Sequence, residues 1–220
     1  MPEDDMMIRI VNVSKTFKGF HALSNININY EKGMIHGIIG RNGSGKTVLL
    51  KCILGLLTPS DGDVFVDGQK VGDCINSIVS TGAIIESPGF IPSYSGEDNL
   101  KLLAQISGIR YSADQMNSLF ELVDLTSDKK KKVKAYSLGM VQRLGLAQAL
   151  MNDPELLVLD EPMNSLDKKM VQKVKDILKQ ARNRGVTILF SSHIMDDIND
   201  LCDTVTEMDQ GRVCSFIKYS

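Results

Sequence analysis

The feature that most constrains the fold is a glycine-rich stretch at residues 40–47. It matches the phosphate-binding pattern G-x-x-x-x-G-K-[ST] at every fixed position. A short apolar run at 34–39 is typical of a buried strand entering such a loop, and the apolar residues of 47–54 predict a helix leaving it. We predict that the loop binds phosphate through Gly40, Arg41, Asn42, Gly43, Ser44, Gly45, Lys46 and Thr47.

The residue types in this loop have physical reasons. Glycines let backbone N–H groups close around phosphate oxygens, since no Cβ stands in the way. The N-terminus of the following helix adds the positive end of its dipole. Lys46 brings a full charge to the outer phosphates, and the Thr47 hydroxyl is a suitable ligand for Mg²⁺. The loop therefore predicts a nucleotide with Mg²⁺, and Lys46 is a candidate catalytic residue.

Composition indicates a globular chain and limits the classes of partner that we expect. The 220 residues suffice for a substantial core, and 43% hydrophobic and 24% charged residues are ordinary values. A formal net charge of −2 gives no bulk electrostatic reason to expect nucleic acid. The cysteines form no C-x-x-C motif, which fits a reducing cytosol and argues against a zinc site or a disulfide framework. They are Cys52, Cys74, Cys202 and Cys214.

The chain carries no signal for membrane insertion. Its acidic first residues lack the basic-then-apolar layout of a signal peptide. No apolar run approaches the ~20 residues that a membrane-crossing helix needs. If the protein works at a membrane, we expect another chain to supply the spans.

Hydrophobic patterning predicts an α/β fold with a mostly parallel sheet. Residues 23–30 alternate between apolar and asparagine positions, which is typical of a half-buried antiparallel strand. Residues 8–13 and 63–68 also have strand character. Continuous apolar runs at 156–159 and 186–190 indicate buried parallel strands. Further expected elements are a strand at 82–86, a closing hairpin of 205–208 and 212–217, and an amphipathic helix at 170–181.

The middle of the chain predicts helices. Ser95 and Ser112 each begin a stretch that resembles a capping box, and apolar residues at helical spacing follow both. Residues 139–152 are apolar nearly all round, as expected of a well-buried helix. The run of four lysines at 129–132 predicts a solvated surface loop, with phosphate or lipid contact as the alternative. We expect one domain over 1–220, with an α/β core and antiparallel β subdomain at 1–86 and 154–220 and a helical subdomain at about 95–152.

Two acids and a histidine follow predicted parallel strands. Asp160 is the natural carboxylate on the Mg²⁺ side, and Glu161 is placed to polarise an attacking water as general base. Open parallel sheets present the carboxyl ends of their strands to the ligand, which favours this interpretation over a pair of surface acids. His193 follows the next buried strand and could bind the outermost phosphate. A structural histidine is the alternative.

With these parts in place, the chain resembles the nucleotide-binding subunit of an ATP-binding cassette (ABC) transporter over nearly its whole length. The resemblance implies a P-loop NTPase core that binds ATP and Mg²⁺ and hydrolyses ATP. Residues 164–167 resemble the D-loop, which makes Asp167 a candidate nucleotide contact. His193 resembles the switch histidine, and Phe17 matches the aromatic residue that stacks on adenine.

Residues 136–143 resemble the family's signature motif, written L-S-G-G-Q-x-Q-R. Ser137 and Gly139 lie where a helix N-terminus would meet an anion. In the family, that anion is the γ-phosphate of ATP bound to the opposite subunit, so the resemblance implies a second copy of this chain in an ATP sandwich. Leu138 and Met140 depart from the usual Gly and Gln, which puts contact with the partner's ribose in doubt.

Glu86 stands where the family usually has the Q-loop glutamine. This pattern resembles the bacitracin-resistance and lantibiotic-immunity group of exporters. A carboxylate brings charge to Mg²⁺ that an amide lacks, so Glu86 is a candidate metal ligand, although a tolerated loop acid is the alternative. The resemblance also makes Phe90, Ile91 and Tyr94 candidate contacts with a membrane partner.

The resemblance implies an ATPase subunit of an exporter for an antimicrobial peptide, drug or related amphiphile. It would be cytoplasmic, peripheral on the inner face of the cell membrane, and bound to an integral membrane permease. A soluble ABC protein that acts on ribosomes or DNA is one alternative, but those carry two cassettes or long coiled coils, and this chain has neither sustained heptads nor basic charge. A P-loop kinase is a second, but it would have no use for a signature helix.

Overall fold

A computed structural model describes residues 5–72 and 80–219, with the backbone alone for Asp196 and Asp197. Among the cysteines, Cys74 lies outside these residues, and the described ones are free thiols. Within the described ranges, no helix combines the length and the apolar character needed to cross a bilayer.

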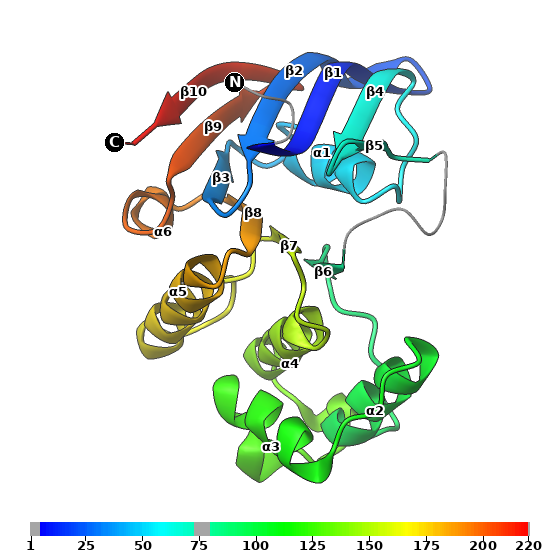
Figure 1. Ribbon diagram of the computed structural model, residues 1–220, viewed down its shortest axis with the longest axis vertical. Helices are drawn as coiled ribbons and strands as arrows, with labels where there is room; N and C mark the ends of the chain where they lie inside the picture. The colour runs from blue at the N-terminus through cyan, green and yellow to red at the C-terminus, as the bar shows by residue number, and fades with distance from the viewer. Residues whose placement is uncertain (1–4, 73–79, 220) are drawn as a thin grey trace.

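A six-stranded sheet forms the centre of the molecule (Figure 1). In spatial order its strands are β10 (Arg212–Lys218), β9 (Thr204–Asp209), β3 (Ile35–Ile39), β8 (Thr187–Ser192), β7 (Leu156–Asp160) and β6 (Thr81–Ile84). Neighbouring strands from β9 to β6 are parallel, and β10 pairs with β9 in the antiparallel sense. Strands β7 and β8 are buried along their whole length, which explains why their sequences are continuous apolar runs.

A second, antiparallel sheet covers one face of the central sheet together with the helix that follows the glycine-rich loop (Figure 1). Its strands are β2 (Phe20–Glu31), β1 (Met6–Phe17), β4 (Asp61–Val66) and β5 (Gln69–Lys70), and the helix is α1 (Lys46–Ile53). In β2, Ile26 and Tyr30 are buried while Asn27 and Asn29 are exposed. The alternation in the sequence therefore correctly predicted a half-buried antiparallel strand.

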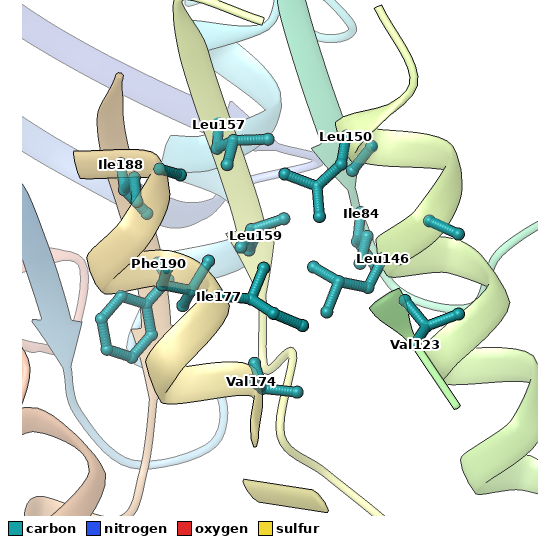
Figure 2. Close-up of a cluster of buried hydrophobic side chains, with 14 of the residues drawn as sticks. Ile84, Val123, Leu146, Leu150, Leu157, Leu159, Val174, Ile177, Ile188 and Phe190 are labelled. Carbon is teal, nitrogen blue, oxygen red and sulfur yellow. The ribbon is translucent and has the colours of Figure 1, made fainter. Parts of the chain in front are cut away.

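Helices α4 (Leu138–Leu150) and α5 (Lys168–Asn183) cover the other face of the central sheet (Figure 2). Strand β7 divides its side chains between the two faces, with Leu157 and Leu159 toward these helices and Leu156 and Val158 toward α1 and the antiparallel sheet. Each buried side chain of this size contributes roughly 1.5–3 kcal/mol relative to exposure. On the helices, the partners drawn around β7 in Figure 2 are Leu146, Leu150, Val174 and Ile177.

Helices α2 (Gly96–Ile106) and α3 (Ala113–Leu122) lie with α4 at the end of the molecule opposite the antiparallel sheet (Figure 1). Ser112 begins a complete capping box, in which the Gln115 N–H donates to Ser112 Oγ and the Ser112 N–H donates to Gln115 Oε1. Ser95 caps α2 by accepting the Asp98 N–H at 3.0 Å, but its own hydroxyl donates to the Asp98 carboxylate at 2.6 Å. Both serines therefore cap their helices as predicted, but only Ser112 forms the complete capping box.

The lysine run lies on the surface between two short 3₁₀ helices, Thr126–Asp128 and Val133–Ala135. Lys130 and its two successors are exposed. The carbonyl oxygens of Lys129 and Lys131 accept the backbone N–H groups of the first turn of α2. The run is thus a surface segment whose backbone caps a helix. Helix α6 (Met195–Asn199) was not predicted, because five residues are too few to display a period.

The architecture confirms the predicted fold class of a mostly parallel sheet with an antiparallel sheet and additional helices. The loop of residues 40–45 follows β3, Asp160 ends β7 with Glu161 directly after it, and His193 follows β8. Because β3, β8 and β7 are neighbours in one parallel sheet, their carboxyl ends bring these groups to one edge.

Candidate nucleotide-binding site

The glycines of the loop are required by its geometry. Gly45 has a φ of 104°, and a Cβ there would lie 2.8 Å from the Ala22 carbonyl oxygen. A Cβ on Gly40 would lie 2.3 Å from the Met208 carbonyl oxygen. Neither position has room for a side chain, so the loop can close only with glycine.

Lys46 is folded back over the loop that precedes it. Its side chain is only 6% exposed, and Nζ donates to the Gly40 carbonyl at 2.7 Å and to the Arg41 carbonyl at 3.3 Å. Ser44 Oγ is buried without a hydrogen-bond partner among the described residues. A buried hydroxyl of this kind is costly unless a ligand completes its bonding, and a phosphate oxygen would do so.

A pocket of about 300 Å³ opens beside the loop. Backbone N–H groups at the N-terminus of α1, the Lys46 ammonium and two acids meet there, which suits a polyphosphate with a cation. The lining residues are Phe20, Ala22, Asn42, Gly43, Ser44, Gly45, Lys46, Thr47, Val48, Asp160 and Glu161.

The residues predicted to hold Mg²⁺ from the loop and from β7 are in direct contact. Thr47 Oγ1 donates to Asp160 Oδ2 at 2.7 Å, and the Asp160 side chain is nearly buried. Hydroxyl and carboxylate oxygens are the ligands that a hard cation prefers. The donor set of Thr47 and Asp160 therefore fits Mg²⁺, with phosphate oxygens and water to complete its coordination.

Glu161 and His193 also meet. Glu161 Oε2 is hydrogen-bonded to His193 Nδ1 at 2.9 Å, and Glu161 Oε1 lies 3.8 Å from Lys46 Nζ. Glu161 has a φ of 49°, so the chain turns sharply as it leaves β7. The turn aims the carboxylate at the phosphate-loop pocket, where a general base would be needed.

The sequence pattern missed two residues that hold these acids in place. Ser191, near the end of β8, donates through Oγ to Asp160 Oδ1 at 2.5 Å and accepts the Glu161 N–H at 3.0 Å. Gln142 of α4 donates to the Glu161 carbonyl at 3.4 Å. The position of Ser191 near the end of a parallel strand was a signal for the first. The second matches the last Gln of the signature motif, although its contact with Glu161 was not predicted.

The signature residues line a different pocket. Ser137 is the N-cap of α4 and accepts the Met140 N–H at 3.3 Å, and Asp167 is the N-cap of α5 and accepts the Met170 N–H at 2.8 Å. Their shared pocket measures about 390 Å³ and has no lining residue in common with the phosphate-loop pocket. It is lined by Asp124, Ser137, Gly139, Arg143, Ser165, Leu166, Asp167, Lys169, Met170 and Lys173.

Tyr136, directly before this cap, fixes the approach to α4. Its hydroxyl donates to the Asp128 carbonyl at 2.8 Å. Partial burial, followed by the negative charge of Asp128, raises the pKa of Tyr136 above its ordinary value. Tyr136 therefore stays protonated and able to donate at neutral pH.

Phe17 and Glu86, like the signature residues, lie outside the phosphate-loop pocket. Phe17 is 43% exposed with Lys15 Nζ 5.2 Å from its ring, whereas its cross-strand partner Phe20 lines the pocket. Glu86 pairs with Lys51 of α1 at 2.7 Å, and its side chain is 64% exposed. The structure thus brings together the loop, Asp160, Glu161 and His193, but not Phe17 or Glu86.

Comparison with known proteins identifies relatives along nearly the whole chain. The ABC transporter family model matches residues 23–164. The ABC transporter ATP-binding protein YybJ of Bacillus subtilis is 42% identical over 207 residues, covering 94% of each chain. The bacitracin transport ATP-binding protein BcrA of Enterococcus faecalis is 37% identical and covers 98% of this chain and 70% of its own. The lantibiotic transport ATP-binding protein SrtF of Streptococcus pyogenes is 34% identical and covers 94% and 89%.

A solved structure agrees with this assignment. The ATP-binding cassette MJ0796, in a dimeric post-hydrolysis state bound to ADP and phosphate, superimposes with a TM-score of 0.89. It is 25% identical, and the match covers 96% of this chain and 98% of that one. The phosphate loop, the acids at the end of β7 and these similarities together show that the chain belongs to the ABC transporter family, as an ATP-binding subunit with ATP hydrolase activity.

Proposed function

We propose that this chain is the ATPase subunit of an ABC exporter and that it drives cargo through a separate membrane permease. The observation that carries the catalytic part is the continuous chain of contacts from Thr47 through Asp160 and Ser191 to Glu161 and His193. These contacts connect the Thr47 hydroxyl and Asp160 carboxylate, which suit Mg²⁺, with the Glu161 carboxylate, which suits a general base. All of them lie beside one phosphate loop.

Each residue has a role in this proposal. The residues of the phosphate loop and Lys46 hold the β- and γ-phosphates of ATP, and Thr47 and Asp160 hold Mg²⁺. Mg²⁺ supplies charge neutralisation on the phosphates when it is bound. Glu161 accepts a proton from the attacking water, and His193 orients Glu161 and responds to the γ-phosphate.

Two copies of the chain complete each other's sites in this proposal. Ser137 and Gly139 are at the N-terminus of α4, where backbone N–H groups and the helix dipole favour an anion. They are separate from the phosphate loop of the same chain, which supports a head-to-tail dimer in which they reach the ATP held by the other copy. Asp167 shares their pocket and is expected at the same interface.

The partner in the membrane is a permease that contacts the loop between β6 and α2. Ile91 and Tyr94 are exposed there, and buried Asn99 holds the loop by bonding both backbone groups of Ile91. We place the chain at the inner face of the membrane. A helical subdomain at about 95–152, within a single domain, passes the closing and opening of the dimer on to the permease. The names of BcrA and SrtF support an antimicrobial peptide, a drug or a related amphiphile as cargo.

Mixing two inactive variants tests the shared site. Lys46→Ala removes the phosphate-binding charge from the half of the site that the phosphate loop forms. Ser137→Asp keeps a good helix cap but places a negative charge against the γ-phosphate in the other half. Only a mixed dimer contains one intact pair, so ATP hydrolysis should appear on mixing although neither variant hydrolyses ATP alone.

Phosphate release is measured for each variant and for the equimolar mixture, with wild type diluted to the same concentration as the control. Activity of the mixture at the level of the separate variants would contradict the shared site. Copurification of the tagged chain with an integral membrane protein from its native membrane tests the permease separately. Recovery of the chain without any such protein would contradict the transport role.

A further inference from the structure

Ser191 occupies a central place for a residue with such a small side chain. It is the second-last residue of β8, has no exposed surface, and lies opposite Asp160 in the parallel pairing of β7 and β8. Its hydroxyl donates to Asp160 Oδ1 at 2.5 Å and accepts the Glu161 N–H at 3.0 Å. One buried hydroxyl therefore bonds both Asp160, which ends β7, and Glu161, which follows it.

The contact with Asp160 determines which way the carboxylate faces. Ser191 holds Oδ1 from the β8 side, while Thr47 Oγ1 bonds Oδ2 at 2.7 Å from the phosphate loop. Two donors on opposite oxygens fix the plane of the carboxylate. Oδ2 is thereby kept toward the loop, where the cation is needed. Without Ser191, Thr47 would be the single hydrogen-bond donor to this carboxylate among the described residues.

The contact with Glu161 concerns the backbone. Glu161 has a left-handed φ of 49°, which costs energy for a residue with a Cβ. Ser191 Oγ gives its N–H an acceptor at this sharp turn. The hydroxyl thus stabilises the turn that aims the Glu161 carboxylate at Lys46 and His193.

We propose that Ser191 is a positioning residue that holds the metal-side carboxylate and the general base in register with each other. The inference rests on the proposed roles of Asp160 and Glu161. Ser191 also lies two residues before His193 on the same strand end. A displacement of the end of β8 is therefore transmitted to the carboxylate, the base and the histidine at once.

The matched control is the neighbouring serine. Ser192 is also buried, but its hydroxyl accepts the Ile194 N–H at 3.0 Å and bonds neither acid. Ser191→Ala and Ser192→Ala remove the same atom from adjacent positions. Loss of a group that orients a metal ligand typically weakens metal affinity by about 10- to 100-fold.

The experiment uses Mn²⁺ as a spectroscopic substitute for Mg²⁺. Electron paramagnetic resonance measures the binding of Mn²⁺ to the ADP-loaded full chain. We expect the dissociation constant for Mn²⁺ to rise about tenfold or more in Ser191→Ala and to stay at the wild-type value in Ser192→Ala. ADP binding without a divalent cation should be the same in all three proteins. The Mg²⁺ concentration for half-maximal ATP turnover should rise in parallel.

A structural effect of the substitution is separated by the melting temperature and by Ser191→Thr, which keeps the hydroxyl. Recovery of Mn²⁺ affinity in Ser191→Thr supports positioning. Equal Mn²⁺ affinity of wild type and Ser191→Ala would overturn the inference, as would a loss shared with Ser192→Ala. Those results would leave the proposed ATPase roles intact. The ATPase roles would be contradicted by different results, namely ATP turnover by wild type without Mg²⁺ or full activity of Lys46→Ala.

Discussion

Lys51 and Glu86 form an ion pair that links the helix after the phosphate loop to the loop after β6, with Lys51 Nζ 2.7 Å from Glu86 Oε1. Glu86 has a left-handed φ of 58°, so the chain turns directly at this residue. The pair occupies the carboxylate that we proposed as a metal ligand. Lys51 therefore competes with a cation for this carboxylate.

Lys51→Met should free this carboxylate. Because the Glu86 side chain is 64% exposed, the free energy of unfolding should change by less than about 1 kcal/mol. The Mg²⁺ concentration for half-maximal ATP turnover should fall by up to about fivefold, which is the equivalent of that pairing energy. Steady-state phosphate release against Mg²⁺ measures it.

The double variant Lys51→Met/Glu86→Gln serves as the control, since it has neither the pair nor the carboxylate. It should respond to Mg²⁺ like Glu86→Gln alone. If Lys51→Met and wild type show the same Mg²⁺ dependence, Glu86 is a loop acid and not a metal ligand.

Phe17 and Phe20 allow a direct test of the adenine contact. Phe17 matches the family position, but Phe20 is the one that lines the phosphate-loop pocket. We expect Phe17→Ala to weaken ATP binding about fivefold, because one aromatic contact is worth roughly 1 kcal/mol. Equilibrium binding of ATP at the same Mg²⁺ concentration is the measurement. If ATP binding is weakened in Phe20→Ala but not in Phe17→Ala, Phe20 is the residue that stacks on adenine.

Gly82 in β6 is expected to tolerate no side chain. A Cβ there would lie 1.9 Å from the Ala149 carbonyl oxygen, because α4 crosses β6 at backbone contact. Gly82→Ala should lower stability by about 1–3 kcal/mol through overpacking. In a chain of this size the melting temperature should fall by roughly 2–4 °C for each kcal/mol.

Gly89 provides the matched control, because a Cβ there would meet nothing within 4 Å. Gly89→Ala should leave the melting temperature within about 2 °C of wild type, as surface substitutions usually do. Equal melting temperatures for Gly82→Ala and Gly89→Ala would show that α4 can move away from β6 at little cost.

The burial of His36 leads us to expect that the stability of the folded chain depends on pH. The ring is fully buried, with Nδ1 2.7 Å from Thr204 Oγ1 and Nε2 donating to the Glu31 carbonyl at 2.8 Å. Burial lowers the pKa of His36 below its ordinary 6.5, although the bond to Glu31 and nearby acids oppose that shift. Below about pH 6.5 the unfolded chain therefore binds a proton that the folded chain does not, and stability falls as the pH decreases.

Urea unfolding at pH 7.5 and pH 5.5 measures this loss, which for one histidine is at most about 1.4 kcal/mol per pH unit. His36→Gln keeps a donor but cannot be protonated, so its stability should change less between the two pH values. An equal loss in His36→Gln and wild type would assign the acid sensitivity to other groups.

Much of the fold follows from local patterns in the sequence. The half-buried face of β2 is visible in its alternating asparagines, and the buried strands β7 and β8 in their continuous apolar runs. The serine caps of α2 and α3 are likewise local, since a cap bonds only to its own first turn. Helix α6 escaped prediction because it is shorter than two helical turns.

The sequence by itself determined the phosphate loop, because eight consecutive residues with glycine at defined places suffice to specify that backbone. It also placed Asp160, Glu161 and His193 at strand ends. Only the tertiary structure decided which side chains meet there. β8 lies between β3 and β7, so Ser191 stands between the loop and the acids, although it is 31 residues from Asp160 in the chain.

The same holds for the pairing of Lys51 with Glu86 and for the separation of Ser137 from the phosphate loop. Such contacts depend on strand order and on register. A hydrophobic pattern records which face of an element is buried, but it does not record which neighbour covers that face. That is the physical reason why the chemistry of single residues could be predicted here while their partners had to come from the fold.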